Sequence, residues 1–148
     1  MARPAIMNTS ILGVALCALG LSAGSAPASA QDGVPDLTGM WSGKATGGVV
    51  AGNLGHQEPG NEPRFKDTSV TWTITIDKQE GPGLIGSWAS PSRKEELIGV
   101  IRPDNKTVLF VDPDTFFSGF LRSENEMEAC LQENGESMVA TCYVFTRQ

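Results

Sequence analysis

From Val70 to the C-terminus, the sequence alternates short β-forming runs with turn residues, about every ten residues. The clearest run, Val70 to Ile76, alternates strictly, so that Trp72, Ile74 and Ile76 share one face and three threonines share the other. No stretch keeps the 3.6-residue period of an amphipathic helix over an adequate length. This rhythm predicts an all-β fold in which short hairpins join antiparallel neighbours.

Eight strands are expected, and most are separated by turn-forming Pro, Asp, Asn and Gly residues. They cover residues 37–45, 70–76, 84–89, 97–101, 107–111, 116–121, 127–132 and 138–146. Eight consecutive antiparallel strands can close on themselves and leave no exposed sheet edge. We therefore predict an eight-stranded up-and-down β-barrel, with a two-sheet β-sandwich as the alternative. A sandwich normally needs more long crossing connections than the single one present.

That long connection spans residues 46–66 and contains five glycines, two prolines and the only histidine, His56. Loops of this length in compact domains are usually functional or disordered. The loop would lie at one mouth of the barrel, where a ligand would enter. His56 has Glu58 and Glu62 close by, but one histidine and two carboxylates are a thin set for zinc, so we expect no metal or cofactor.

The sequence contains no recognisable catalytic constellation. A Ser-His-Asp arrangement would have to use His56 without a nucleophile-elbow motif. The acids Glu95 and Glu96 are consecutive, so they point to opposite faces of a strand and are interpreted as a solvated edge. We predict no catalytic residue and a binding module rather than an enzyme.

The first 30 residues have the layout of a secretory signal peptide: Arg3, an apolar run over 11–21, and small residues ending in Ala28-Ser29-Ala30. The apolar run is too short to span a bilayer as a helix. We expect cleavage before Gln31, leaving residues 31–148 as one domain that is periplasmic or secreted, with no membrane anchor. This domain has ten basic and 17 acidic residues, a net charge of −7. Its scattered basic residues predict no nucleic-acid partner.

Cys130 and Cys142 remain after cleavage, and an even count in an exported chain favours a disulfide. A two-residue turn at Asn134-Gly135 would place Cys130 opposite Val139. A three-residue loop over 135–137 would instead place Cys130 directly opposite Cys142, close enough for a bridge. We predict the three-residue loop and the disulfide.

Leu37-Thr38-Gly39-Met40-Trp41 opens the first strand with a G-x-W motif. This motif before an eight-strand meander resembles the avidin and lipocalin group of calycin-like barrels. In lipocalins the tryptophan plugs one end of the barrel and a basic residue from the end of the last strand packs on it. The resemblance implies that Arg147 lies over Trp41. It does not extend to the biotin-contacting residues of avidin, so biotin binding is not implied.

The three tryptophans have two interpretations. Trp41 and Trp88 share faces with glycines that would leave room for a large ring, so core packing explains them. Alternatively, a cavity lined by tryptophan and threonine holds a small apolar or amphipathic ligand. The candidate ligand-binding residues are Trp41, His56, Glu58, Trp72, Trp88 and Tyr143. The expected function is ligand binding, and the alternative is a protein-interaction module such as a hydrolase inhibitor.

Three adjacent predicted strands, 97–101, 107–111 and 116–121, are apolar on both faces. For example, Ile98 and Leu97 are consecutive and point to opposite faces of their strand, as do Phe116 and Phe117. A barrel wall buries only its inner face, and monomers seldom expose a contiguous apolar patch. We therefore predict a symmetric homodimer.

Overall fold

The computed structural model describes residues 33–52 and 60–148, which form an all-β domain without helices. The expected signal peptide, His56 and Glu58 lie outside these residues. The strands are β1 (Gly39–Gly52), β2 (Gly60–Phe65), β3 (Thr71–Glu80), β4 (Gly83–Ala89), β5 (Lys94–Ile101), β6 (Thr107–Val111), β7 (Thr115–Ser123), β8 (Glu126–Glu133) and β9 (Ser137–Arg147). None of the described segments forms an apolar helix of membrane-spanning length.

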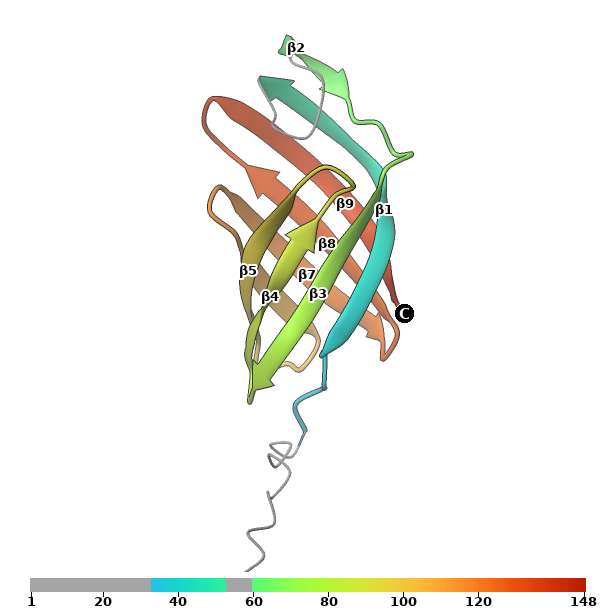
Figure 1. Ribbon diagram of the computed structural model, residues 1–148, viewed down its shortest axis with the longest axis vertical. Coiled ribbons are helices and arrows are strands. Elements are labelled where there is room, and N and C mark those ends of the chain that lie inside the picture. The colour runs from blue at the N-terminus through green and yellow to red at the C-terminus, as the bar shows by residue number, and fades with distance from the viewer. Residues whose placement is uncertain (1–32, 53–59) are drawn as a thin grey trace, which may run out of the picture.

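Eight of these strands close into an antiparallel barrel, as predicted (Figure 1). Strands β3 to β9 pair with their sequence neighbours in order. Strand β1 closes the wall because it pairs with both β3 and β9: Trp41 lies opposite Ile74 on one side and Arg147 on the other. β2 is an additional strand outside the barrel wall and pairs with the far end of β1.

The predicted loop over 46–66 is partly wrong, because β1 continues to Gly52 and β2 occupies Gly60–Phe65. Its glycines have low intrinsic strand propensity, but β9 offers them a paired backbone, with Gly48 opposite Thr141. A Cβ atom on Gly48 would lie 2.5 Å from the Thr141 side chain, so glycine permits this close pairing. Tertiary pairing therefore overrides local propensity here.

The alternation of side chains places one face of every barrel strand in the core. In β3, Trp72, Ile74 and Ile76 are buried, whereas the intervening Thr73 and Thr75 are half-buried on the outside. The largest fully buried side chains are Trp41, Tyr143, Phe110, Phe117, Phe145, Ile74, Leu97, Met127, Val50 and Val108. The interior is thus filled mainly by large apolar groups.

One end of the barrel is closed by Trp41 and Arg147. The Arg147 guanidinium carbon lies 5.3 Å from the Trp41 ring centroid, as the resemblance implied. Arg147 Nη2 also donates a hydrogen bond to the Thr38 carbonyl at 2.6 Å, and Trp41 Nε1 donates one to the Leu37 carbonyl at 3.0 Å. The segment before β1 is therefore bound across this end, which we call the closed end.

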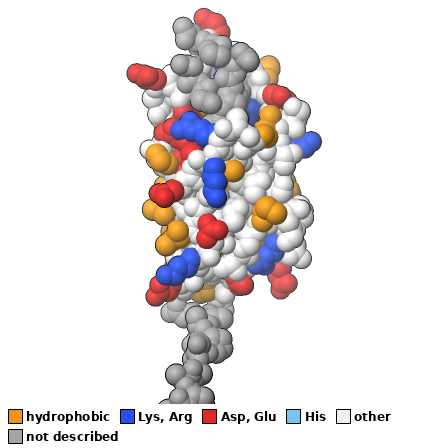
Figure 2. Space-filling model, viewed as in Figure 1, with side chains coloured by type: hydrophobic (Ala, Val, Ile, Leu, Met, Phe, Trp, Pro, Cys, Tyr) orange, Lys and Arg blue, Asp and Glu red, His pale blue; other side chains and the backbone are white. Residues whose placement is uncertain are grey.

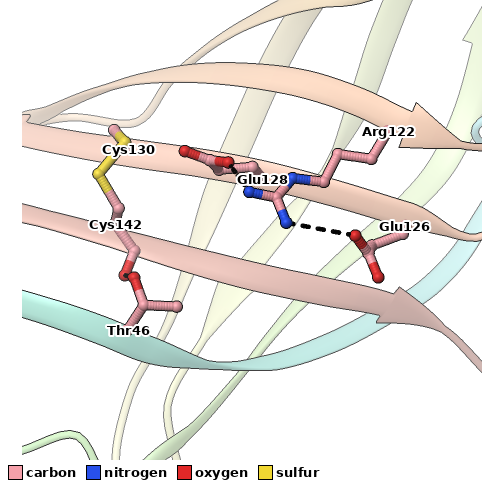
Figure 3. Close-up of polar contacts among 6 residues, drawn as sticks. All are labelled: Thr46, Arg122, Glu126, Glu128, Cys130 and Cys142. Atoms are coloured by element: carbon pink, nitrogen blue, oxygen red, sulfur yellow. Dashed lines mark hydrogen bonds and ion pairs between the residues drawn. A yellow bond between two sulfur atoms is a disulfide. The ribbon is translucent and has the colours of Figure 1, made fainter.

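The β8–β9 hairpin has the predicted register and disulfide. Cys130 lies directly opposite Cys142 and is bonded to it, and Glu133 lies opposite Val139. This register is the one that a three-residue loop gives. Figure 3 shows the bridge between β8 and β9, with Arg122 of β7 directed toward Glu126 and Glu128.

The outer face of β4 to β7 carries an uninterrupted apolar row. Directly opposed residues from the four strands form it: Ile85, Ile98, Val111 and Phe116. Ile85 and Ile98 are 55% and 56% exposed, and Phe116 is 42% exposed. Figure 2 shows hydrophobic side chains along the left margin of the molecule, the side where Figure 1 places β5. We call these four residues, together with Val100 and Leu109, the outer apolar wall.

Candidate functional site

An aromatic cluster from four strands fills the middle of the barrel interior. Trp72 in β3 stacks on Trp88 in β4, with ring centroids 4.4 Å apart and ring planes 14° from parallel. Tyr143 in β9 meets the two tryptophans edge-on at centroid distances of 6.0 and 5.5 Å. Phe117 and Phe145 contact Trp88 edge-on at 5.0 and 6.1 Å. The structure thus brings together three residues that the sequence singled out: Trp72, Trp88 and Tyr143.

Trp41, another of those candidates, lies nearer the closed end. In the β1–β3 register it pairs with Ile74, whereas Trp72 pairs with Gly43, which is two residues closer to the opposite end. Trp41 is fully buried, and both its ring face and its indole nitrogen are occupied by contacts that hold the closed end together. We call the opposite end of the barrel, beyond Trp72, the mouth.

Lys66 covers the aromatic cluster at the mouth. Its ammonium nitrogen lies 5.0 Å from the Trp72 ring centroid and 6.0 Å from that of Tyr143, an arrangement in which the negative face of the ring attracts a cation. The Lys66 backbone N–H donates to the Gly48 carbonyl at 3.0 Å. Lys66 is only 8% exposed, and burial lowers the pKa of its amine, which attraction to Asp67 and Glu133 opposes.

Four carboxylates are placed around the same mouth by the ends of the barrel strands. Glu95 in β5 and Glu133 in β8 occupy inward positions of the strand alternation. Asp112 and Asp114 lie in the turn between β6 and β7. Carboxylate oxygens of Glu95, Asp112 and Asp114 lie within 4.8 Å of one another. These acids and Lys66 give the mouth a charged rim above an aromatic floor.

Burial disfavours the charged forms of two of these acids. It raises the pKa of Asp112 to about 6, and the neighbouring Glu95 charge adds to the shift, while hydrogen bonds from Thr115 oppose it. Burial also raises the pKa of Glu95, which the positive charge of Arg93 opposes through a direct ion pair. A positive charge close to these two acids would favour their ionised forms and offset the effect of burial. The site is therefore suited to a cation.

Two buried polar atoms at the site have no hydrogen-bond partner of standard geometry among the described residues: the Tyr143 hydroxyl and Asp112 Oδ2. Tyr143 is fully buried, and burial raises the pKa of its hydroxyl, an effect that the Thr141 side chain opposes. An unpaired buried polar group costs about 1–3 kcal/mol. A ligand that offers hydrogen-bond donors would recover part of this cost.

The mouth also holds a group of side chains that could bind a metal ion. Glu95, Asp112 and Asp114 supply oxygen ligands, the type that Ca²⁺ and Mg²⁺ prefer. A second grouping, Glu128 with Cys130 and Cys142, offers no thiolate because both sulfurs form the disulfide. The chemistry of the mouth therefore suits a cation.

Sequence reasoning placed some of these residues correctly and missed others. Glu95 and Glu96 do face opposite sides, but Glu95 is half-buried at the mouth and is not part of a solvated edge. Glu62, the remaining acid near His56, is exposed on β2.

One of the missed carboxylates, Glu133, follows a pattern that the sequence does contain. Glu133 lies two residues beyond the buried Leu131 in β8, so extending the alternation by one step predicts its inward position. No pattern marks Lys66, because it follows β2, a strand that the sequence did not predict.

The closed eight-stranded barrel and the contact between Arg147 and Trp41 are compatible with a calycin-like barrel. No protein-family model, curated protein or solved structure matches the chain at a significant level.

Proposed function

We propose that this chain is an exported, calycin-like barrel that binds a small amphipathic molecule at its mouth. The observation that carries the proposal is the position in the chain of Lys66, the residue that covers the aromatic cluster. This side chain covers the aromatic cluster, yet it comes from the segment between β2 and β3 and from no strand of the barrel wall. The closed end, by contrast, is held by Trp41 and Arg147 of the wall itself.

The segment that carries Lys66 is weakly attached. Among the described residues, β2 pairs with β1 alone, and the register is interrupted between Val50 and Gly52. Phe65 at the end of β2 is 91% exposed, so it contributes little apolar burial. Segments with few buried apolar contacts open locally at low free-energy cost. Movement of this segment would uncover the aromatic faces of Trp72 and Tyr143.

The uncovered surface would have the composition of a small-molecule site. Such sites combine apolar and aromatic walls with a few fixed polar groups. Trp72 and Tyr143 supply the aromatic faces, and the Tyr143 hydroxyl and the Asp112 carboxylate supply the polar groups. A ligand with an apolar body and one polar end fits this arrangement.

Two features support a periplasmic or secreted location. Residues 1–30 have the layout of a signal peptide. The Cys130–Cys142 disulfide is of the kind that persists in oxidising compartments.

Native mass spectrometry and NMR of the exported protein test this proposal. We expect the mass of residues 31–148 with one disulfide and a bound small molecule. Titration with tryptophol, a neutral indole alcohol, should shift the indole N–H signals of Trp72 and Trp88 and leave that of Trp41 unchanged. A protein that carries no bound molecule and whose Trp72 signal responds neither to tryptophol nor to its charged analogues tryptamine and indole-3-acetate would overturn the proposal.

A second candidate role, protein interaction, is favoured by the outer apolar wall. Its six residues carry no charge, and five of them line a hollow of about 340 Å³ together with Gly99: Ile98, Val100, Leu109, Val111 and Phe116. An uncharged apolar surface is complementary to itself, as a two-fold symmetric interface requires. We propose a second copy of this chain as its occupant.

A further inference from the structure

We propose that the mouth is a seat for an organic ammonium group, and that Lys66 fills this seat until a ligand amine replaces it. This inference rests on the proposed ligand-binding function and specifies the chemical class of the ligand.

The Lys66 ammonium marks the position that a cation takes in this site. It lies over two aromatic faces at once, those of Trp72 and Tyr143. Trp offers the most favourable ring for a cation, and the interaction strengthens when water is excluded, as it is around a side chain that is 8% exposed. A ligand amine in the same place would keep both contacts.

The charges at the mouth favour a cation over an anion. Glu95, Asp112, Asp114 and Glu133 are acidic, and the nearby Arg93 is already paired with Glu95. Withdrawal of Lys66 would leave an excess of carboxylates beside an apolar floor. Uncompensated charge of this kind is costly, so a replacement cation is favoured and a ligand carboxylate is disfavoured.

The unpartnered atoms point to the same ligand chemistry. When Asp112 is ionised, its Oδ2 atom is a hydrogen-bond acceptor and has no proton to donate. The Tyr143 hydroxyl can also accept a hydrogen bond. An ammonium group carries up to three N–H donors, whereas a neutral alcohol carries one. A ligand amine can therefore satisfy acceptors that the described residues leave open.

Three indole probes of similar shape test the inference: tryptamine, which is a cation, tryptophol, which is neutral, and indole-3-acetate, which is an anion. Affinities for the full exported protein are measured by calorimetry at pH 7. We expect tryptamine to bind at least tenfold more tightly than tryptophol, and indole-3-acetate to bind most weakly. Because this comparison uses the wild-type chain, it does not depend on the folding of any variant.

The variant Lys66→Met removes the internal ammonium and keeps much of the apolar stem. We expect it to bind tryptamine at least fivefold more tightly than wild type. Lys44→Met is the matched control, because Lys44 is exposed on the outside of β1, and it should leave the affinity unchanged.

Two results distinguish failure of this inference from failure of the proposed function. Equal or tighter binding of tryptophol or indole-3-acetate, or unchanged tryptamine affinity in Lys66→Met, would overturn the ammonium seat while leaving ligand binding intact. Absence of binding by all three probes would overturn both.

Discussion

At the scale of single residues, Asp112 is held where its surroundings oppose its charge. Its pKa is raised from 3.8 to about 6, first by burial, and one of its oxygens has no partner in the described part of the chain. A folded state that raises the pKa of an acid binds a proton that the unfolded chain releases. The stability contributed by this proton is fully present below about pH 4 and is lost as the pH rises through 6.

Asp112→Asn should therefore change how stability depends on pH. The asparagine stays uncharged, so the variant should gain stability relative to wild type as the pH rises from 4 to 7.5. Denaturant unfolding at several pH values measures this difference. Asp77→Asn, at an exposed position of β3, should keep the wild-type pH dependence because Asp112 remains. A difference between Asp112→Asn and wild type that stays constant with pH would contradict the prediction.

Arg147 is the second residue whose contacts predict a measurable effect. Arg147→Ala removes the cation from the Trp41 ring and the hydrogen bond to the Thr38 carbonyl. We expect a loss of about 1–2 kcal/mol in the free energy of unfolding, with export retained. Arg102→Ala, at an exposed turn of the same end, is the control. Equal melting temperatures for the two variants would show that the contact does not hold the closed end.

At the scale of the strands, glycine sets how closely neighbouring backbones approach. A Cβ atom on Gly86 would meet the Thr75 carbonyl oxygen of β3 at 1.9 Å, so the close approach of the two backbones requires glycine at this position. At Gly99 the nearest neighbour is a side chain, because a Cβ atom there would lie 2.5 Å from the Phe110 ring. Gly86 therefore lets β3 and β4 approach closely.

Gly86→Ala should consequently destabilise the barrel by about 1–3 kcal/mol, because a packed backbone cannot move aside as a flexible side chain can. Gly47→Ala is the control, since nothing lies within 4 Å of its added Cβ atom, and it should leave stability nearly unchanged. Thermal and denaturant unfolding of both variants measure the contrast. Similar losses in the two variants would mean that backbone approach at Gly86 is not the cause.

At the scale of the whole molecule, the outer apolar wall predicts self-association. Ile98→Lys and Phe116→Lys together place two charges in its central row and should convert a wild-type dimer to a monomer without changing the fold. Val49→Lys with Met138→Lys places the same charges at exposed apolar positions outside the wall and should leave the dimer intact. Sedimentation equilibrium at micromolar concentration measures all three proteins. A monomeric wild type would refute the homodimer.

Much of the fold could be predicted from the sequence. Turn residues and alternation located every barrel strand, with the exact bounds Thr107–Val111 for β6. The expected disulfide favoured the three-residue loop, and with it the register that pairs Cys130 with Cys142. The full extent of β1 and the presence of β2 could not be predicted, because their glycine-rich sequences gain strand structure only from neighbours.

The sequence by itself determined which face of each strand enters the core, because the pleated backbone sends successive side chains to opposite sides. Trp72 and Tyr143 were identifiable as inward residues for this reason. Only the tertiary structure decided that Lys66 would lie over both rings and that Glu95 would meet Asp112. The contact between Lys66 and Tyr143 joins segments distant in the chain, and it arises only when β1 closes on β9. Glu95 and Asp112 meet because the pairing of β5 with β6 brings the start of one strand beside the end of the other.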